Sequence, residues 1–359
     1  MSEKTGLPAQ AFPAGEYLRD EIDARGWSVA EFAHILGRPT QAVSEILNGH
    51  KEITVETAVE IAAATGTEAS TWLRLQDTYR LWKVARAEPQ KAATVSRRAR
   101  LSQLVPMHEL RQRGIVPQDA GIDEEEAAVC ALLGISDTTS TPSIKFAARR
   151  SDEGAPISPA QLAWISCVKR AARLDNSAAR PLGDIRELAS EVVRRVAEPE
   201  ALSGLPDLFL EYGIRLVHVP PFKAGKIDGG AYLDRSGIPV IALSGRIQRI
   251  DSVVFTLLHE LAHVYLGHLT SGIALDSDVC AATENKAERD ADRCAMGWAL
   301  PEPLGISAPI SKRAVTQRAA ALGVHPGLIV GRLQYQGKLP WSHLRDLTPN
   351  VRTYLSVWE

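Results

Sequence analysis

The chain has 359 residues, which is long for a single domain and favours two or three. Its composition, 45% hydrophobic and 23% charged, is that of an ordinary soluble globular protein, and no apolar run approaches the roughly 18 to 20 residues of a membrane span. The net charge of -2 excludes a global basic field, so any nucleic-acid binding must come from a local patch.

Short helices with clear start and stop signals make up residues 12–88. One of them opens with a capping box, in which Ser28 is the N-cap and Glu31 follows three residues later, and it ends at Gly37. The expected helices are 15–26, 28–37, 39–49, 54–66 and 67–87. We therefore predict an all-helical first domain.

The second and third of these helices have the form of a helix-turn-helix over 28–49. A tight turn joins them, and this geometry presents the start of the second helix to the major groove of DNA. Polar side chains on that helix suit base edges, and basic side chains beside it suit phosphates. The candidate base-reading residues are Thr40, Gln41 and Ser44, and the candidate phosphate contacts are Arg38, His50 and Lys51. A plain helical hairpin with a polar surface is the alternative.

Several stretches of this domain resemble the HigA family of antitoxins and regulators. They are "SVAEFAHILG", "AVSEILNG", "ITVETAVEIAAATGT" and "WLRLQDTYRLW", and the resemblance covers about residues 12–86. It implies a five-helix Xre-type DNA-binding fold, which is normally a homodimer on a palindromic double-stranded DNA operator. It also implies that a HigB-like toxin is a possible partner, because some relatives neutralise such ribonucleases.

A basic segment follows at 89–113, where a solvated helical face and a phosphate-contacting stripe are equally good interpretations. We expect a helical connecting region over 89–200. From 205 onwards β-rich runs separated by glycines alternate with helices, which predicts an α+β domain over 201–359. The expected strands lie at 212–220, 229–234 and 237–244, and the expected helices at 253–268, 284–300 and 311–323. The fold class is thus mainly α with an α+β C-terminal part.

The helix expected at 253–268 is apolar almost all round, yet it contains the pattern H-E-x-x-H. Two imidazoles one turn apart suit two corners of a tetrahedral zinc site, so His259 and His263 are candidate ligands. Glu260 between them is the candidate general base for a zinc-activated water. The pattern arises by chance in about one chain in a hundred of this size. Chance, however, leaves three polar groups inside an apolar helix without an explanation.

A third ligand is expected from the helix at 284–300, which offers Glu288 and Asp290. If Glu288 faces the metal, Asp292 lies one turn further along the same face and is placed to accept a histidine N–H. Asp290 then points elsewhere, so Glu288 is the favoured ligand and Asp290 the alternative.

"FTLLHELAHVYLGH" and "ERDADRCAMGWALP" resemble the ImmA/IrrE family of metallopeptidases, over about residues 205–305. The resemblance implies a gluzincin-like fold, one Zn2+ ion and cleavage of a partner repressor protein. It assigns His259, His263 and Glu288 as ligands and Glu260 as the base. The sequence departs from the family pattern at Cys294, where Phe is usual, and at Asp290, where Glu is common.

Four further residues are weaker candidates for a role at the site: His268, His325, Tyr232 and Tyr335. The four cysteines form no C-x-x-C pair, and the N-terminus carries no apolar signal segment, which together predict free thiols in a cytoplasmic protein. Two functions remain open. The chain is either a DNA-binding regulator with a zinc endopeptidase domain, or a DNA-binding antitoxin or regulator whose zinc domain is a sensor or an inactive scaffold.

Overall fold

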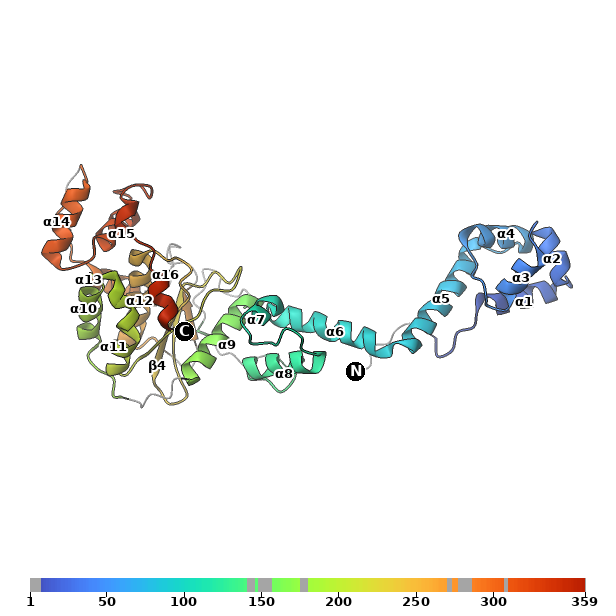
Figure 1. Ribbon diagram of the computed structural model, residues 1–359, viewed down its shortest axis with the longest axis horizontal. Helices are drawn as coiled ribbons and strands as arrows, with labels where there is room; N and C mark the ends of the chain where they lie inside the picture. Colours follow the sequence, from blue (N-terminus) through green and yellow to red (C-terminus); the bar gives the residue numbers. More distant parts are fainter. Residues whose placement is uncertain are drawn as a thin grey trace. The chain divides into compact units, whose positions relative to one another are not determined.

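The computed structural model describes residues 8–140, 157–174, 180–269, 286–306 and 309–358, and the backbone of two short strands at 146–147 and 273–276. The chain divides into two compact units, residues 1–98 and 99–359. The described residues are mainly helical, with one small sheet in the larger unit (Figure 1). The three domain ranges expected from the sequence stay a prediction.

Within the described part of the smaller unit, five helices precede α6, in agreement with the sequence. They are α1 (Ala14–Ala24), α2 (Val29–Ile35), α3 (Thr40–Leu47), α4 (Val55–Thr65) and α5 (Ala69–Ala87). The predicted capping box is present, because Ser28 Oγ accepts from the backbone N–H of Glu31 while the Glu31 carboxylate accepts from the backbone N–H of Ser28. Apolar side chains from all five helices form one core, in which Phe32, Ile61 and Trp72 are buried.

The helix α6 (Pro89–Leu104) runs across the boundary between the two units, and the remaining helices belong to the larger unit. These are α7 (Met107–Gln112), α8 (Ile122–Leu133), α9 (Pro159–Leu174), α10 (Ile185–Arg195), α11 (Leu205–Glu211), α12 (Ile250–Tyr265), α13 (Lys286–Ala299), α14 (Lys312–Leu322), α15 (Pro326–Tyr335) and α16 (Arg352–Leu355). Short 3-10 turns lie at Pro199–Gly204, Arg345–Leu347 and Ser356–Trp358.

The sheet has five strands in the order β1-β5-β3-β4-β2. The strands are β1 (Phe146–Ala147), β2 (Arg215–His218), β3 (Gly229–Leu233), β4 (Pro239–Leu243) and β5 (Ile273–Asp276). The strand β3 runs antiparallel to β4 and β5, whereas β2 is parallel to β4 and β1 is parallel to β5. The sequence predicted β2, β3 and β4 but neither β1 nor β5.

Helices cover both faces of the sheet (Figure 1). Successive side chains of a strand therefore point alternately into one of two apolar cores. In β4, Ile241 and Leu243 pack with α10 to α13, while Val240 and Ala242 pack with α9 and its neighbours. The helical segment before the sheet is therefore part of the larger unit's core. This two-sided burial explains why β4 is apolar along its whole length.

The helix α12 is the centre of the first of these cores and is buried over most of its length. Among the described helices, none combines the length and apolar character that crossing a bilayer requires. Cys130, Cys167 and Cys294 are free thiols, and Cys280 lies outside the described residues.

Candidate metal centre and nucleic-acid interface

The polar trio of α12 lies in the interior of the larger unit. His259, Glu260 and His263 are only 2%, 1% and 2% exposed. Helix α13 packs along α12 and contributes Glu288, which is also buried. Burial of polar groups costs several kcal/mol unless ligands or hydrogen bonds satisfy them, so the partners of these side chains decide what they do.

Three donor atoms converge between α12 and α13. His259 Nε2 lies 3.0 Å from His263 Nε2 and 3.0 Å from Glu288 Oε2, and His263 Nε2 lies 3.6 Å from the same oxygen. Ligand atoms of the three residues all lie within 4.8 Å of one another. The structure therefore brings together the residues that the sequence singled out.

The donor set fits zinc. Bonds of about 2.0 to 2.1 Å to a tetrahedral zinc place neighbouring ligand atoms about 3.3 Å apart. The observed separations of 3.0 and 3.6 Å lie on either side of that value. Two imidazole nitrogens and one carboxylate oxygen are also the kind of ligands that zinc prefers.

The remaining ring nitrogens of both histidines have partners of their own. His259 Nδ1 lies 2.9 Å from Asp292 Oδ1, as expected from the spacing of Glu288 and Asp292 on α13. His263 Nδ1 lies 3.1 Å from His268 Nδ1. Each contact fixes the orientation of a ring and leaves its Nε2 directed at the centre.

The backbone that follows α12 explains how His268, one of the weaker candidates, comes into contact with His263. Helix α12 ends at Tyr265, and Gly267 then adopts a left-handed conformation with φ 66°. The backbone N–H of His268 donates to the His263 carbonyl, so the chain folds back and returns the imidazole to His263. The glycine before His268 was the signal in the sequence that the helix ends there and the chain turns back.

Glu288 is held as a carboxylate. Burial alone would raise its pKa, but hydrogen bonds and charge from His259 and His263 outweigh that effect and lower the pKa well below its usual range. Asp290, the alternative ligand, instead makes an ion pair with Arg293 at 3.2 Å. The geometry thus favours Glu288 over Asp290.

Glu260 packs against the start of β3. A Cβ built on Gly229 would lie 3.1 Å from Glu260 Oε1 and 2.8 Å from Thr256 Cγ2, so only glycine allows strand and helix to approach this closely. The candidate base is therefore confined between α12 and the sheet.

Of the other weak candidates, His325 and Tyr232 have structural roles and Tyr335 lines a pocket. His325 is the N-cap of α15, where its ring accepts from the backbone N–H of Gly327, and burial lowers its pKa. Tyr232 is buried in β3, and this burial raises its pKa to about 12. Tyr335 lies at the end of α15, beside a pocket described below.

The candidate DNA-contacting residues lie on α3 or beside one of its two ends. Thr40 and Gln41 are exposed in its first turn, and Gln41 Nε2 donates to Glu45 at 3.2 Å. Ser44 is half-buried and accepts from Asn48. His50 and Lys51 are exposed just beyond the helix. Five of the six candidates are thus grouped around the exposed surface of one short helix.

Arg38, the sixth candidate, is already engaged. Its guanidinium makes a bidentate ion pair with Glu60 of α4, and this hydrogen bond raises its pKa. The pair joins the turn before α3 to α4. Arg38 therefore orients the turn, and Glu60 offsets part of the charge that a phosphate would meet.

Comparisons with known proteins bear on the smaller unit. Residues 18–72 match the helix-turn-helix family. Over 87 residues the chain is 30% identical to the uncharacterized HTH-type transcriptional regulator YddM of Escherichia coli (strain K12), and the match covers 24% of this chain and 87% of that protein. The chain belongs to the helix-turn-helix family. Its N-terminal unit is a DNA-binding helix-turn-helix domain of the transcriptional-regulator type.

Antitoxins are among the solved structures similar to this helix-turn-helix chain. An addiction module antidote protein of a HigA family from Coxiella burnetii is 34% identical, and the match covers 23% of this chain and 90% of that one, with a TM-score of 0.22. The antitoxin GraA is 25% identical, with 24% of this chain and 94% of that one covered and a TM-score of 0.23.

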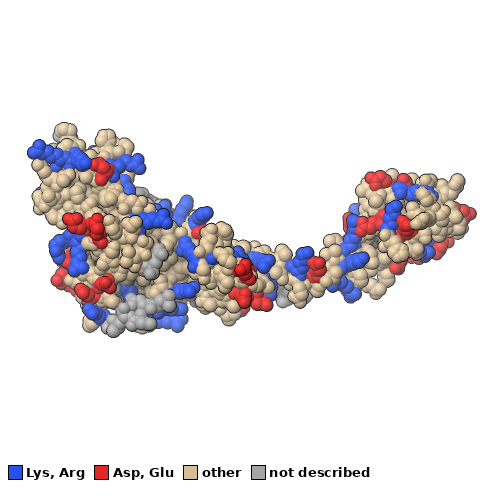
Figure 2. Space-filling view, in the orientation of Figure 1, with Lys and Arg blue, Asp and Glu red and all other residues tan. Residues whose placement is uncertain are grey.

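The surface of the helix-turn-helix domain carries both basic and acidic side chains. Figure 2 shows both signs mixed over the visible face of this unit, in accord with a net charge of -2 for the whole chain. In the basic segment, Arg111 pairs with Glu125 at 2.6 Å, and Arg113 donates to the carbonyls of Pro220 and Pro221. These two arginines have partners inside the larger unit and do not form a free phosphate stripe.

Proposed function

We propose that the protein is a DNA-binding transcriptional regulator whose larger unit is a zinc-dependent endopeptidase of the ImmA/IrrE type. The observation that carries the second half of the proposal is the buried convergence of His259, His263 and Glu288, with Asp292 behind His259. In this proposal the larger unit has a gluzincin-like active site, and its substrate is a protein, such as a partner repressor.

The DNA-binding half acts as a homodimer on a palindromic operator, with α3 of each copy in a major groove. Thr40, Gln41 and Ser44 contact base edges, and Lys51 and His50 contact phosphates. The antitoxin-like relatives make a HigB-like toxin a further candidate partner.

Zinc held by the three side chains would supply a Lewis acid for the scissile carbonyl and bring the pKa of a water molecule toward neutrality. Glu260 accepts a proton from the attacking water at a carboxylate oxygen and then donates it to the departing amide nitrogen. Asp292 and His268 keep the two imidazoles oriented throughout, through their contacts with the Nδ1 atoms.

Zinc content and peptide cleavage test this half of the proposal. We expect one zinc per chain in the wild type and in Asp290→Ala, and none in Glu288→Ala or His263→Ala. Glu260→Gln should keep zinc and lose all cleavage of a peptide library. Cleavage retained by Glu260→Gln would refute the role assigned to Glu260, and full zinc occupancy in Glu288→Ala would refute the ligand set.

One observation favours the second candidate, a regulator whose zinc domain does not catalyse. All three candidate ligands and Glu260 are nearly inaccessible to solvent, and a peptide bond that does not reach the metal is not cleaved. This candidate is favoured if the zinc-loaded protein cleaves no peptide and its operator affinity falls when zinc is removed. The zinc domain is then a sensor or a scaffold.

Operator binding is tested separately, with DNA fragments selected by the protein from a random-sequence pool. Affinity should fall steeply with salt, because phosphate contacts release counterions. The variant Gln41→Ala should alter the selected sequence. An unchanged selected sequence in a triple variant of Thr40, Gln41 and Ser44 to Ala would refute α3 as the reading helix.

A further inference from the structure

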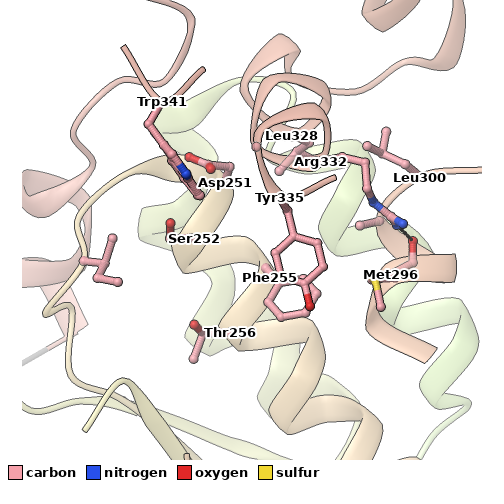
Figure 3. A pocket seen from close by; sticks show the side chains of 13 residues that line it. Asp251, Ser252, Phe255, Thr256, Met296, Leu300, Leu328, Arg332, Tyr335 and Trp341 are labelled. Atoms are coloured by element: carbon pink, nitrogen blue, oxygen red, sulfur yellow. Dashed lines mark hydrogen bonds between the residues drawn. The ribbon is translucent and has the colours of Figure 1, made fainter. Parts of the chain in front are cut away.

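A pocket lies beside α12, one helical turn before the metal centre (Figure 3). It has a volume of about 110 Å³ and is formed by α12, the end of α13 and α15, with Trp341 at one side. Phe255 and Tyr335 point into it from α12 and α15, as Figure 3 shows. None of these residues has a role in the function proposed above.

The two charged side chains that line the pocket, Asp251 and Arg332, already have hydrogen-bonding partners. The Arg332 guanidinium donates to the Met296 carbonyl at 2.6 Å and to Glu302 at 2.8 Å. Asp251 is held by a bidentate ion pair with Arg249 at 2.9 and 3.0 Å. A charged ligand would have to compete with these partners, so the remaining lining, which includes Phe255, Met296 and Leu328, favours an apolar group.

The pocket is connected to the metal centre through α12. Phe255 precedes His259 by four residues, and their rings are in contact with centroids 6.2 Å apart. Thr256 lines the pocket and precedes Glu260 by the same interval, and both side chains pack on Gly229. A group bound in the pocket therefore contacts the two residues that lie one helical turn before His259 and Glu260 on α12.

The rim of the pocket is exposed and aromatic. Tyr335 and Trp341 are each 55% exposed, and Ile247 is 39% exposed. A pocket that buries a free small molecule is usually closed over most of its ligand, whereas this one continues to the surface as an apolar rim. That shape suits a side chain carried by a longer polypeptide.

We propose that this pocket receives one apolar side chain, aromatic or branched aliphatic, of the polypeptide bound at the metal centre. The volume of about 110 Å³ is somewhat smaller than the engineered cavity of about 150 Å³ that binds benzene, so a Leu- or Phe-sized group is the upper limit. The inference rests on the proposed peptidase function and specifies which substrates that site selects.

Binding is measured without catalysis on the full-length protein labelled with methyl-13C methionine. The chain has three methionines, of which Met296 lines the pocket and Met107 lies in α7, so one signal reports on the pocket and another is an internal control. N-acetyl-leucinamide and N-acetyl-phenylalaninamide should shift the Met296 signal, whereas N-acetyl-glutaminamide should not. Absence of any Met296 shift would overturn the inference.

A variant that fills the pocket separates it from other surfaces. Ala299 lines the pocket, and Ala299→Leu should weaken the leucinamide titration about tenfold or more, as expected for a misfit of this size. Ala320→Leu makes the same change at an exposed position of α14 and should leave the titration unchanged. Equal weakening by both variants would also overturn the inference. Zinc content should be the same in both.

Cleavage of a peptide library by the zinc-loaded protein distinguishes this inference from the function beneath it. If the cut sites are enriched in an apolar residue beside the cleaved bond, and Ala299→Leu loses this enrichment, both the pocket's role and the peptidase function are supported. Cutting without apolar enrichment overturns the pocket's role and leaves the peptidase intact. No cutting, together with Met296 shifts, overturns the peptidase and the substrate role and makes the pocket a site for a free apolar compound.

Discussion

Replacing Asp292 by Asn should weaken zinc binding without abolishing it. Asp292 does not lie among the converging donor atoms but accepts a hydrogen bond from His259 Nδ1, at 2.9 Å. Removal of such a carboxylate typically costs 10- to 100-fold in metal affinity. The Asp292 side chain is 27% exposed, so water partly screens the contact and partly replaces it. We therefore expect zinc affinity to fall by the lower end of this range, about tenfold, which corresponds to about 1.4 kcal/mol of binding free energy.

The assay is competition for zinc with a chromophoric chelator at fixed pH, with Asp290→Asn as the matched control. Asp290 lies two residues away on α13 and pairs only with Arg293 among the interactions described, so its replacement should leave zinc affinity unchanged. Far-UV circular dichroism should be identical for both variants. Equal affinities of wild type and Asp292→Asn, or a matching loss in Asp290→Asn, would refute the positioning role.

Other substitutions probe packing and recognition. Gly229→Ala forces a Cβ against Thr256 and Glu260 and should lower the free energy of unfolding in urea by about 1 to 3 kcal/mol, whereas Gly204→Ala, which meets nothing, should change it by about 0.5 kcal/mol or less. Phe32→Ala should destabilise the helix-turn-helix unit by about 3 to 5 kcal/mol, as judged by its urea midpoint. Lys51→Ala should reduce the salt dependence of DNA binding by about one ion, measured as the slope of log affinity against log salt, and an unchanged slope would exclude the phosphate contact. Burial raises the pKa of Cys167 to about 11, so its thiol should resist iodoacetamide at pH 8 until the protein is unfolded. Mass spectrometry after brief labelling measures this, and a labelled Cys167 in the folded protein would refute the prediction.

Local patterns in the sequence predicted most of the side chains that converge at the candidate metal centre. The spacing of His259 and His263 on one helical face, and of Glu288 and Asp292 on another, follows from 3.6 residues per turn. That periodicity also placed Asp290 on a different face from Glu288, which made it the alternative ligand, and the structure pairs Asp290 with Arg293. Capping signals located α2, α4 and their ends equally well.

Contacts between distant segments could not be predicted in this way. The pairing of Arg38 with Glu60 depends on how α4 packs beside the turn, and no periodicity in the sequence specifies that. Strands β1 and β5 escaped notice because they are short and their stability depends on neighbours in the sheet. The contact between His268 and His263 was not predicted, because the expected helix continued through Gly267. In the structure, Gly267 has a left-handed backbone that reverses the chain.

The separation of hydrophobic cores has an evolutionary consequence. Among the residues that the structure describes, the core of the N-terminal unit is formed by residues between Ala14 and Leu75, whereas the cores of the larger unit begin at Leu101. Distant mutations without shared partners have additive effects on stability. Substitutions that adapt α3 to a new operator therefore act on the stability of the core in which α3 packs. The histidines of α12 can be retained by selection while the DNA target changes, and the two units can be recombined with other domains as separate modules.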